Sequence, residues 1–365
     1  MTTPFGALVA QRSVIVCCGT GGVGKTTAAA AIGLAAARLG RRVVVVTIDP
    51  ARRLADALGV EQLTNEPQRV ATFDATATTA AGELWATMLD TKRTFDDLVG
   101  LHAADDAQRR RILANRFYEN ISGSLSGTQE YMAAEKLYEL HADTRFDLVV
   151  VDTPPTRNAL DVLDAPERLA NFLDHRLYRT LMAPTRLYLK AANLAAQAFL
   201  RAVSKVVGGE VIADAIAFFQ AFDGMEQGFR ERATAARALL GATDTAFVVI
   251  ASPRADTITE ATWFIAQLEA RHTPAAALVV NRAHPRFGPI NAADARRRAK
   301  ASRAIGTRAR WTNLAELTEV ADAEDAEIAP LRASLGDAPT VVVALRATDL
   351  HDLAALTSLA DDLLA

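Results

Sequence analysis

The sequence predicts an α/β fold, a doubly wound and mostly parallel sheet with an inserted helical subdomain. Short runs rich in valine and isoleucine alternate with helical stretches, which is the order of a parallel sheet covered by helices on both faces. These runs span 13–18, 42–49, 146–152, 246–252, 275–281 and 340–345. Between about Asp164 and Leu240 the strand pattern stops and helical periodicity replaces it.

The first run leads into a glycine-rich loop. Residues 19–26 read G-T-G-G-V-G-K-T, a full match to the P-loop pattern, and an alanine-rich helical stretch follows. Such a loop closes backbone N–H groups round phosphate oxygens, and the helix N-terminus adds partial positive charge. Lys25 then reaches the β- and γ-phosphates, Thr26 binds Mg²⁺, and Thr27 donates to the α-phosphate. The predicted cofactors are ATP and Mg²⁺, and the predicted binding loop is Gly19, Thr20, Gly21, Gly22, Val23, Gly24, Lys25, Thr26 and Thr27.

Two later runs end in carboxylates, and ligands of such sheets bind at the carboxyl ends of strands. Asp152 closes "LVVVD" and has the position of the acid that holds the Mg²⁺ shell, with a helix cap as the alternative. Asp49 closes the second run. Because Pro50 follows it at a helix start, an ordinary N-cap is the favoured interpretation of Asp49 by itself.

Four motifs taken together change that interpretation. "GTGGVGKTT", "TIDPARRLADAL", "LVVVDTPPTRNAL" and "VVNR" resemble, in order and spacing, the ArsA-type ATPase family, which includes the arsenite-pump ATPase and the eukaryotic ATPase that targets tail-anchored membrane proteins. The resemblance extends from about Ser13 to Asn281, and "TDLHDLAAL" from Thr348 is similar to the family's last helix.

The resemblance implies a role for each matching residue. Asp49 and Lys25 would act in catalysis, with Asp49 polarising the attacking water. Thr26 and Asp152 would support Mg²⁺, and Asn281 would recognise adenine. "SGTQEY", with Gly127 and Glu130, resembles a weaker family motif near the subunit interface.

The chain also departs from the family pattern. The second loop position is normally a lysine that reaches the partner subunit's nucleotide, and here it is Thr20. Three arginines, Arg52, Arg53 and Arg157, replace other residues near the phosphates. One of them could act as an arginine finger, and the alternative is that they are solvated or paired with carboxylates.

The cysteines set further limits. Cys17 and Cys18 are adjacent on a predicted strand, so their side chains point to opposite faces and cannot jointly bind a metal. The sequence thus resembles a bacterial member of the family without its metal-binding cysteines. With no other cysteine, a disulfide within the chain is excluded and a cytoplasmic location is expected.

The predicted organisation is one P-loop ATPase domain over 1–365 with helix-rich insertions at 89–137 and 164–240, and 241–365 as the second part of the core. The second insertion contains an amphipathic helix over 187–206 and an aromatic stretch with Phe218, Phe219, Phe222, Met225 and Phe229. Burial is the favoured interpretation of that stretch, and a client-binding surface is the alternative. The acidic residues 318–330 are expected to form a surface loop.

The composition restricts the partners. A net charge of −3 argues against nucleic-acid binding, and no apolar run reaches a membrane-spanning length. The resemblance implies a homodimer, or a heterodimer with a paralogous ATPase, that handles an apolar client or a membrane-protein partner. Two hypotheses follow: a Mg²⁺-dependent ATPase that works as a nucleotide-controlled dimer switch, and a weakly hydrolysing regulatory subunit that pairs with a lysine-containing paralogue.

Overall fold

The computed structural model describes residues 3–49, 52–74, 80–124, 128–154, 161–174, 209–347 and 352–365. The chain forms two compact units. A core unit comprises Met1–Met88, Asp143–Ala159 and Thr243–Ala365, and a helical unit comprises Leu89–Ala142 and Leu160–Ala242.

The core unit is built on an eight-stranded sheet with the order β3-β4-β2-β5-β1-β6-β7-β8. All neighbouring strands are parallel except β3 and β4. The strands are β1 (Val14–Gly19), β2 (Arg42–Thr47), β3 (Gln68–Phe73), β4 (Gly82–Met88), β5 (Leu148–Asp152), β6 (Thr245–Ala251), β7 (Ala275–Ala283) and β8 (Thr340–Ala344). The predicted fold class is therefore confirmed.

Six of these strands coincide with the predicted runs, and β3 and β4 were missed. Along β4 fully buried residues are interrupted by half-buried ones, including Glu83 and Trp85, so this strand lacks a continuous Val/Ile run. β3 is an edge strand with exposed Arg69, and its pairing with β4 is antiparallel. Neither strand carries the pattern of a central parallel strand.

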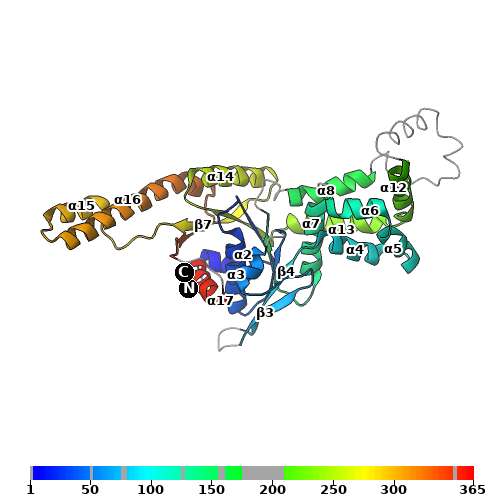
Figure 1. The fold of residues 1–365 in the computed structure, drawn as a ribbon, viewed down its shortest axis with the longest axis horizontal. Coiled ribbons are helices and arrows are strands. Elements are labelled where there is room, and N and C mark those ends of the chain that lie inside the picture. Colours follow the sequence, from blue (N-terminus) through cyan, green and yellow to red (C-terminus); the bar gives the residue numbers. More distant parts are fainter. Residues whose placement is uncertain are drawn as a thin grey trace. The chain divides into compact units, whose positions relative to one another are not determined.

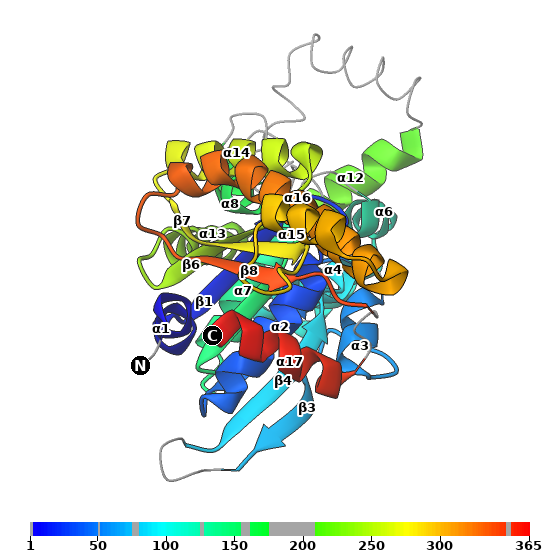
Figure 2. The ribbon, with the colours of Figure 1, turned by 90° about the vertical axis from the view of Figure 1, so that its left-hand side faces the viewer.

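The alanine-rich helix after the P-loop packs tightly on the sheet. Every residue of α2 from Ala28 to Ala37 is buried, and a Cβ added at Gly33 would lie 2.4 Å from a Val45 methyl. In Figure 2, α2 and α17 lie side by side on one face of the sheet, and α14 covers the other face. The helices of the core unit are α1 (Pro4–Gln11), α2 (Lys25–Arg38), α3 (Arg53–Leu58), α14 (Ala255–Ala270), α15 (Ala292–Ala301), α16 (Ile305–Ser334) and α17 (Leu353–Leu364).

The prediction of a surface loop at 318–330 is wrong, because these residues belong to the 30-residue helix α16. α15 lies alongside α16 (Figure 1). Ala315, Thr318 and Ala321 recur every three residues and are buried. The acidic residues between them are glutamates, which are good helix formers, and the aspartates at 322 and 325 pair with Arg286. Charge density suggested a loop, but the buried stripe of the helix and the pairing of its acidic side chains with distant cations favour the helix.

The helical unit contains the aromatic stretch, which is buried as favoured except at the half-buried Phe219. Phe218, Phe222, Met225 and Phe229 are each at most 6% exposed, and the rings of Phe222 and Phe229 lie 4.7 Å apart between centroids. These four side chains form part of the interior of the helical unit. The helices are α4 (Thr91–His102), α5 (Asp106–Leu113), α6 (Arg116–Ser124), α7 (Thr128–Ala142), α8 (Asp161–Asp174), α12 (Gly209–Ala221) and α13 (Glu226–Leu240).

Several sequence-based predictions fall outside the described residues. They concern the amphipathic helix at 187–206, Gly127, Arg157, and the start of the last helix at Thr348. Glu130 lies on α7 in the helical unit. None of the described helices is both long and apolar enough to cross a membrane.

Candidate nucleotide-binding site

The P-loop connects the end of β1 to the start of α2, and its glycines are required by its shape. Gly22 and Gly24 have φ angles of 79° and 88°, in the left-handed region that favours glycine. A Cβ at Gly24 would also lie only 2.4 Å from Asn281 Nδ2. Gly24 is the N-cap of α2, so the first N–H groups of the helix face the loop without a side-chain cap in the described structure. This arrangement suits a phosphate group.

The Lys25 side chain lies against the P-loop, where the phosphates would bind. Its side chain is buried, and Nζ donates a hydrogen bond of 2.7 Å to the backbone carbonyl of Thr20. Burial lowers the pKa of Lys25, and the nearby carboxyl of Asp152 opposes that shift. A phosphate would offer this ammonium group a stronger acceptor than the carbonyl.

Asp152 lies at the end of β5, between the ends of β1 and β2 in the sheet. Thr47 Oγ1 donates to its Oδ2 at 2.9 Å, while Oδ1 is buried without a hydrogen-bond partner among the described residues. Burial raises the pKa of Asp152 to about 6, although the Thr26 and Thr47 hydroxyls lower it. The protein therefore holds a poorly solvated carboxylate in need of a cation.

These groups fit a Mg²⁺ ion bound together with a nucleotide. Among the described residues there is no group of three or more His, Cys, Asp or Glu side chains that could hold a metal. Mg²⁺ commonly binds through one or two protein oxygens, water and substrate phosphates. The orphaned Asp152 oxygen and the Thr26 hydroxyl match that limited requirement.

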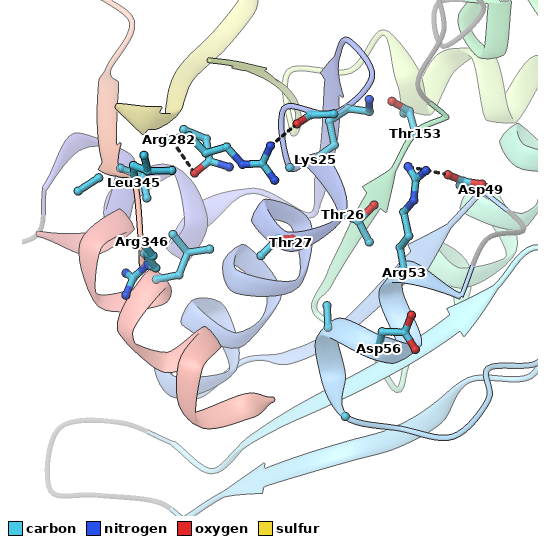
Figure 3. A pocket seen from close by; sticks show the side chains of 18 of the residues that line it. Lys25, Thr26, Thr27, Asp49, Arg53, Asp56, Thr153, Arg282, Leu345 and Arg346 are labelled. Carbon is cyan, nitrogen blue, oxygen red and sulfur yellow. Dashed lines mark hydrogen bonds and ion pairs between the residues drawn. The ribbon is translucent and has the colours of Figure 1, made fainter. Parts of the chain in front are cut away.

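Asp49 follows β2 and forms an ion pair with one of the unusual arginines. Arg53 Nη1 lies 3.6 Å from Asp49 Oδ2, and the two side chains are drawn together in Figure 3. The neighbouring Arg52 instead donates to the backbone carbonyl of Glu61. Of the arginines described here, Arg53 is thus the one that faces the candidate catalytic carboxylate.

These residues surround one cavity of about 1050 Å³ (Figure 3). Lys25, Thr26, Thr27, Asp49 and Asn281 line it, as do Gly22 and Gly24 of the loop. The remaining predicted site residues, which are Gly19, Thr20, Gly21, Val23 and Asp152, do not line the cavity. Asp152 is fully buried close behind its wall, near Thr26 and Lys25. The side chain of Thr20 is also buried, and its hydroxyl has no partner in the described chain.

The opposite wall contains residues that the sequence analysis missed. Arg282 Nη1 donates to the Gly22 carbonyl at 2.7 Å, and Arg346 is held by Asp362 at 2.6 Å. Leu345 contributes an apolar surface beside them. The position of Arg282 directly after Asn281, at a strand end, was the available signal for this residue. Arg346 had no recognisable motif.

Asn281 supports the P-loop from behind. Its Nδ2 donates to the Val23 carbonyl at 2.8 Å, and its Oδ1 accepts the backbone N–H of Arg282. Asn281 therefore fixes the loop as well as lining the cavity. Adenine recognition by this side chain stays a prediction.

A comparison with known protein families identifies the family to which this chain belongs. The family model described as anion-transporting ATPase matches residues 12–302, which span the P-loop, Asp49, Asp152 and Asn281. The chain belongs to the anion-transporting ATPase family. The resemblance to ArsA-type ATPases is confirmed at this level, and the family implies nucleotide binding.

Individual relatives match over a smaller part of the chain. An ATPase ASNA1 homolog from Babesia bovis is 33% identical over 159 residues, covering 44% of this chain and 40% of the relative. Protein Rv2184c from Mycobacterium tuberculosis is 33% identical over 171 residues, covering 45% and 40%. ATPase GET3 from Malassezia globosa is 27% identical over 165 residues, covering 45% and 46%. The matches thus span less than half the length of these relatives.

Proposed function

We propose that this protein binds ATP with Mg²⁺ and hydrolyses it. The observation that carries the proposal is that Lys25, Asp49 and Arg53 line one cavity. Directly behind it lies the buried Asp152 carboxylate, whose Oδ1 has no hydrogen-bond partner among the described residues. Lys25 and Arg53 begin the helices that follow β1 and β2, Asp49 lies just after β2, and Asp152 ends β5. These three strands are neighbours in the sheet. The family assignment and the relatives named as ATPases support the same activity.

The chemistry depends mainly on positioning and charge, as is usual for phosphoryl transfer. Bound Mg²⁺, held by Thr26 and by Asp152 through water, would neutralise charge on the phosphates. Lys25 exchanges the Thr20 carbonyl for the β- and γ-phosphates, and the loop N–H groups bind their oxygens. Asp49 orients the attacking water, and Arg53 leaves Asp49 to contact the γ-phosphate, where the transferred charge develops.

The raised pKa of Asp152 gives a stability prediction. Between its unfolded pKa of about 3.9 and its folded pKa of about 6, the folded chain binds the proton more tightly. The free energy of unfolding therefore contains a contribution that is present below pH 4 and is lost as the pH rises through 6. Asp152→Asn is expected to raise the free energy of unfolding of the nucleotide-free protein at pH 7.5 by on the order of 2–3 kcal/mol. Urea denaturation at pH 4 and pH 7.5 measures it.

Asp147→Asn is the matched control with the opposite sign. Asp147 accepts hydrogen bonds from Arg42, which lower the pKa of this carboxyl. Its contribution to stability is thus present at pH 7.5 and is lost under acid conditions, so this variant should be less stable at pH 7.5. Lower stability of Asp152→Asn at pH 7.5 would contradict the assignment of Asp152 as an uncompensated carboxylate. The same variant should also lose the Mg²⁺ dependence of ATP binding.

The family resemblance supports a further step, in which nucleotide state controls a dimer and moves the helical unit. Helix α4 begins three residues after β4 ends, and β5 leads through 153–160 into α8. The two connections into the helical unit thus follow strands that neighbour β2. A change at Asp49 or Asp152 can bias the helical unit through these connections, so that it holds or releases an apolar client or a membrane-protein partner.

A regulatory subunit is the second candidate function, and Thr20 favours it. The buried Thr20 side chain supplies no cation to a partner's nucleotide. In this alternative the chain binds ATP but hydrolyses it slowly, and a paralogue with a lysine at this position completes a composite site.

Calorimetric titration of the purified protein with ATP tests the shared requirement of both candidates. ATP should bind with Mg²⁺ present, and Lys25→Ala should weaken binding because it removes the ammonium group aimed at the phosphates. Arg12→Ala, on the loop before β1, replaces a cation outside the cavity and should bind ATP normally. Equal affinities of the Lys25→Ala variant and the parent would overturn the assignment of this cavity.

A further inference from the structure

The hairpin of α15 and α16 has strongly separated charges. We call residues 296–311 the basic tip; its cations are Arg296, Arg297, Arg298, Lys300, Arg303, Arg308 and Arg310, with no acidic residue among them. Farther along α16, residues 316–327 contain only acidic charges, at Glu316, Glu319, Asp322, Glu324, Asp325 and Glu327. At a rise of 1.5 Å per residue, the acidic stretch begins about 17 Å from the start of α16.

The acidic stretch is partly paired with cations of the core unit. Arg286 pairs with Asp322 and Asp325 at 2.7 and 2.6 Å, and both the ring and the backbone N–H of His284 contact Glu324. Arg296 of the basic tip pairs with Glu319 at 2.5 Å. This part of the hairpin is therefore attached to the segment that follows β7.

The basic tip is not neutralised in the same way. Arg297 pairs with Asp294, Arg298 stacks 4.9 Å above the Trp311 ring, and Arg308 donates to the Ser302 carbonyl that closes the turn. Lys300, Arg303 and Arg310 are exposed, and none has an acidic partner among the described residues. Three cations are thus available to an outside anion.

An apolar side chain lies at the apex between these cations. Ile305, the first residue of α16, is 85% exposed, and a Cβ added at the adjacent Gly306 would meet nothing within 4 Å. Exposure of a single isoleucine is ordinary by itself. Ile305 begins α16, and Arg303 and Arg308 lie two and three residues from it in the sequence, so an exposed apolar side chain stands among the cationic residues of the hairpin.

We propose that the basic tip docks onto an anionic phospholipid surface. Cationic side chains with long apolar stems reach lipid phosphates while an apolar residue enters the headgroup boundary, and Trp311 suits the same interface. Charge complementarity selects this partner, and the exposed aliphatic apex favours lipid over nucleic acid. A nucleic-acid backbone gives Ile305 no apolar environment. This docking does not depend on ATP hydrolysis.

Vesicle co-sedimentation of the full chain tests the proposal. Binding is expected to vesicles that contain phosphatidylglycerol with phosphatidylcholine, to weaken as sodium chloride is raised, and to be absent with phosphatidylcholine alone. The triple variant Lys300→Gln, Arg303→Gln, Arg310→Gln should bind about a hundred-fold more weakly, because each surface cation contributes about five-fold. These three side chains have no acidic partner in the described hairpin, so circular dichroism and thermal unfolding should be unchanged.

The matched control removes the same charge elsewhere. Arg109, Arg110 and Arg111 are exposed on α5, and their triple replacement by glutamine should leave vesicle binding within about two-fold. Ile305→Ser, which keeps every charge, should weaken binding about ten-fold. Equal binding to neutral vesicles, or an equal loss in both triple variants, would overturn the proposal. Binding to a duplex DNA without binding to vesicles would assign the basic tip to nucleic acid instead.

Discussion

Replacing Asp49 with asparagine is expected to lower ATP turnover by about 10²- to 10⁴-fold, because the carboxylate that orients the attacking water is removed. Asparagine has the same size as aspartate but only one side-chain oxygen, so it cannot accept hydrogen bonds from water at both positions. ATP binding should change by no more than a few-fold, because the P-loop and Lys25 remain. Phosphate release at saturating ATP, together with a binding titration, separates the two effects.

Asp56→Asn is the control for this variant. Asp56 lines the same cavity from α3 and carries the same charge, but it is solvent-exposed and lies farther along the chain from β2. Its replacement should leave turnover within about two-fold, since exposed charges interact weakly. Similar losses in Asp49→Asn and Asp56→Asn would show that the charge of the cavity matters and that Asp49 has no specific role.

Replacing Arg53 with alanine is expected to lower turnover by about 10³-fold, the lower end of the effect of an arginine finger. The ion pair with Asp49 is exposed on the arginine side and contributes little to stability, so the variant should unfold at nearly the same temperature. The Arg53→Ala variant should show a lower kcat and a nearly unchanged ATP affinity, because the guanidinium contacts the phosphate chiefly in the transition state.

The adjacent Arg52 provides the comparison. Its guanidinium donates to the Glu61 carbonyl and it does not line the cavity. Arg52→Ala should therefore retain turnover within a few-fold. Unchanged turnover in Arg53→Ala would refute the arginine-finger role, and Asp49 would then be paired with Arg53 for structural reasons alone.

Much of the core sheet was predictable because buried parallel strands need continuous apolar runs. The run of four valines in β2, between polar residues, indicates a buried strand. The P-loop match placed Lys25 and Thr26 correctly at the start of α2. Asp49, just after β2, and Asn281, near the end of β7, could be placed at the same edge because the strands from β2 to β7 in the sheet are parallel. Local pattern and global topology agree for these elements.

The elements that escaped prediction depend on contacts between distant residues. The acidic part of α16 looked like a loop until Arg286 and His284, about forty positions earlier, were seen to pair with it. Arg52 and Arg53 are neighbours with the same side chain, so only the backbone direction at the start of α3 distinguishes their targets. The burial of Thr20 likewise follows from the path of the loop. A threonine in a P-loop does not by itself predict that its side chain is buried.

The most direct test of the account is steady-state ATP hydrolysis with Mg²⁺ by the purified chain over a range of protein concentrations, beside Thr20→Lys. Turnover per chain is expected to rise with protein concentration, as a dimer forms, and not to require the introduced lysine. Tight ATP binding with negligible turnover at every concentration, restored by Thr20→Lys, would contradict a self-sufficient ATPase and would show that the missing lysine belongs to another subunit.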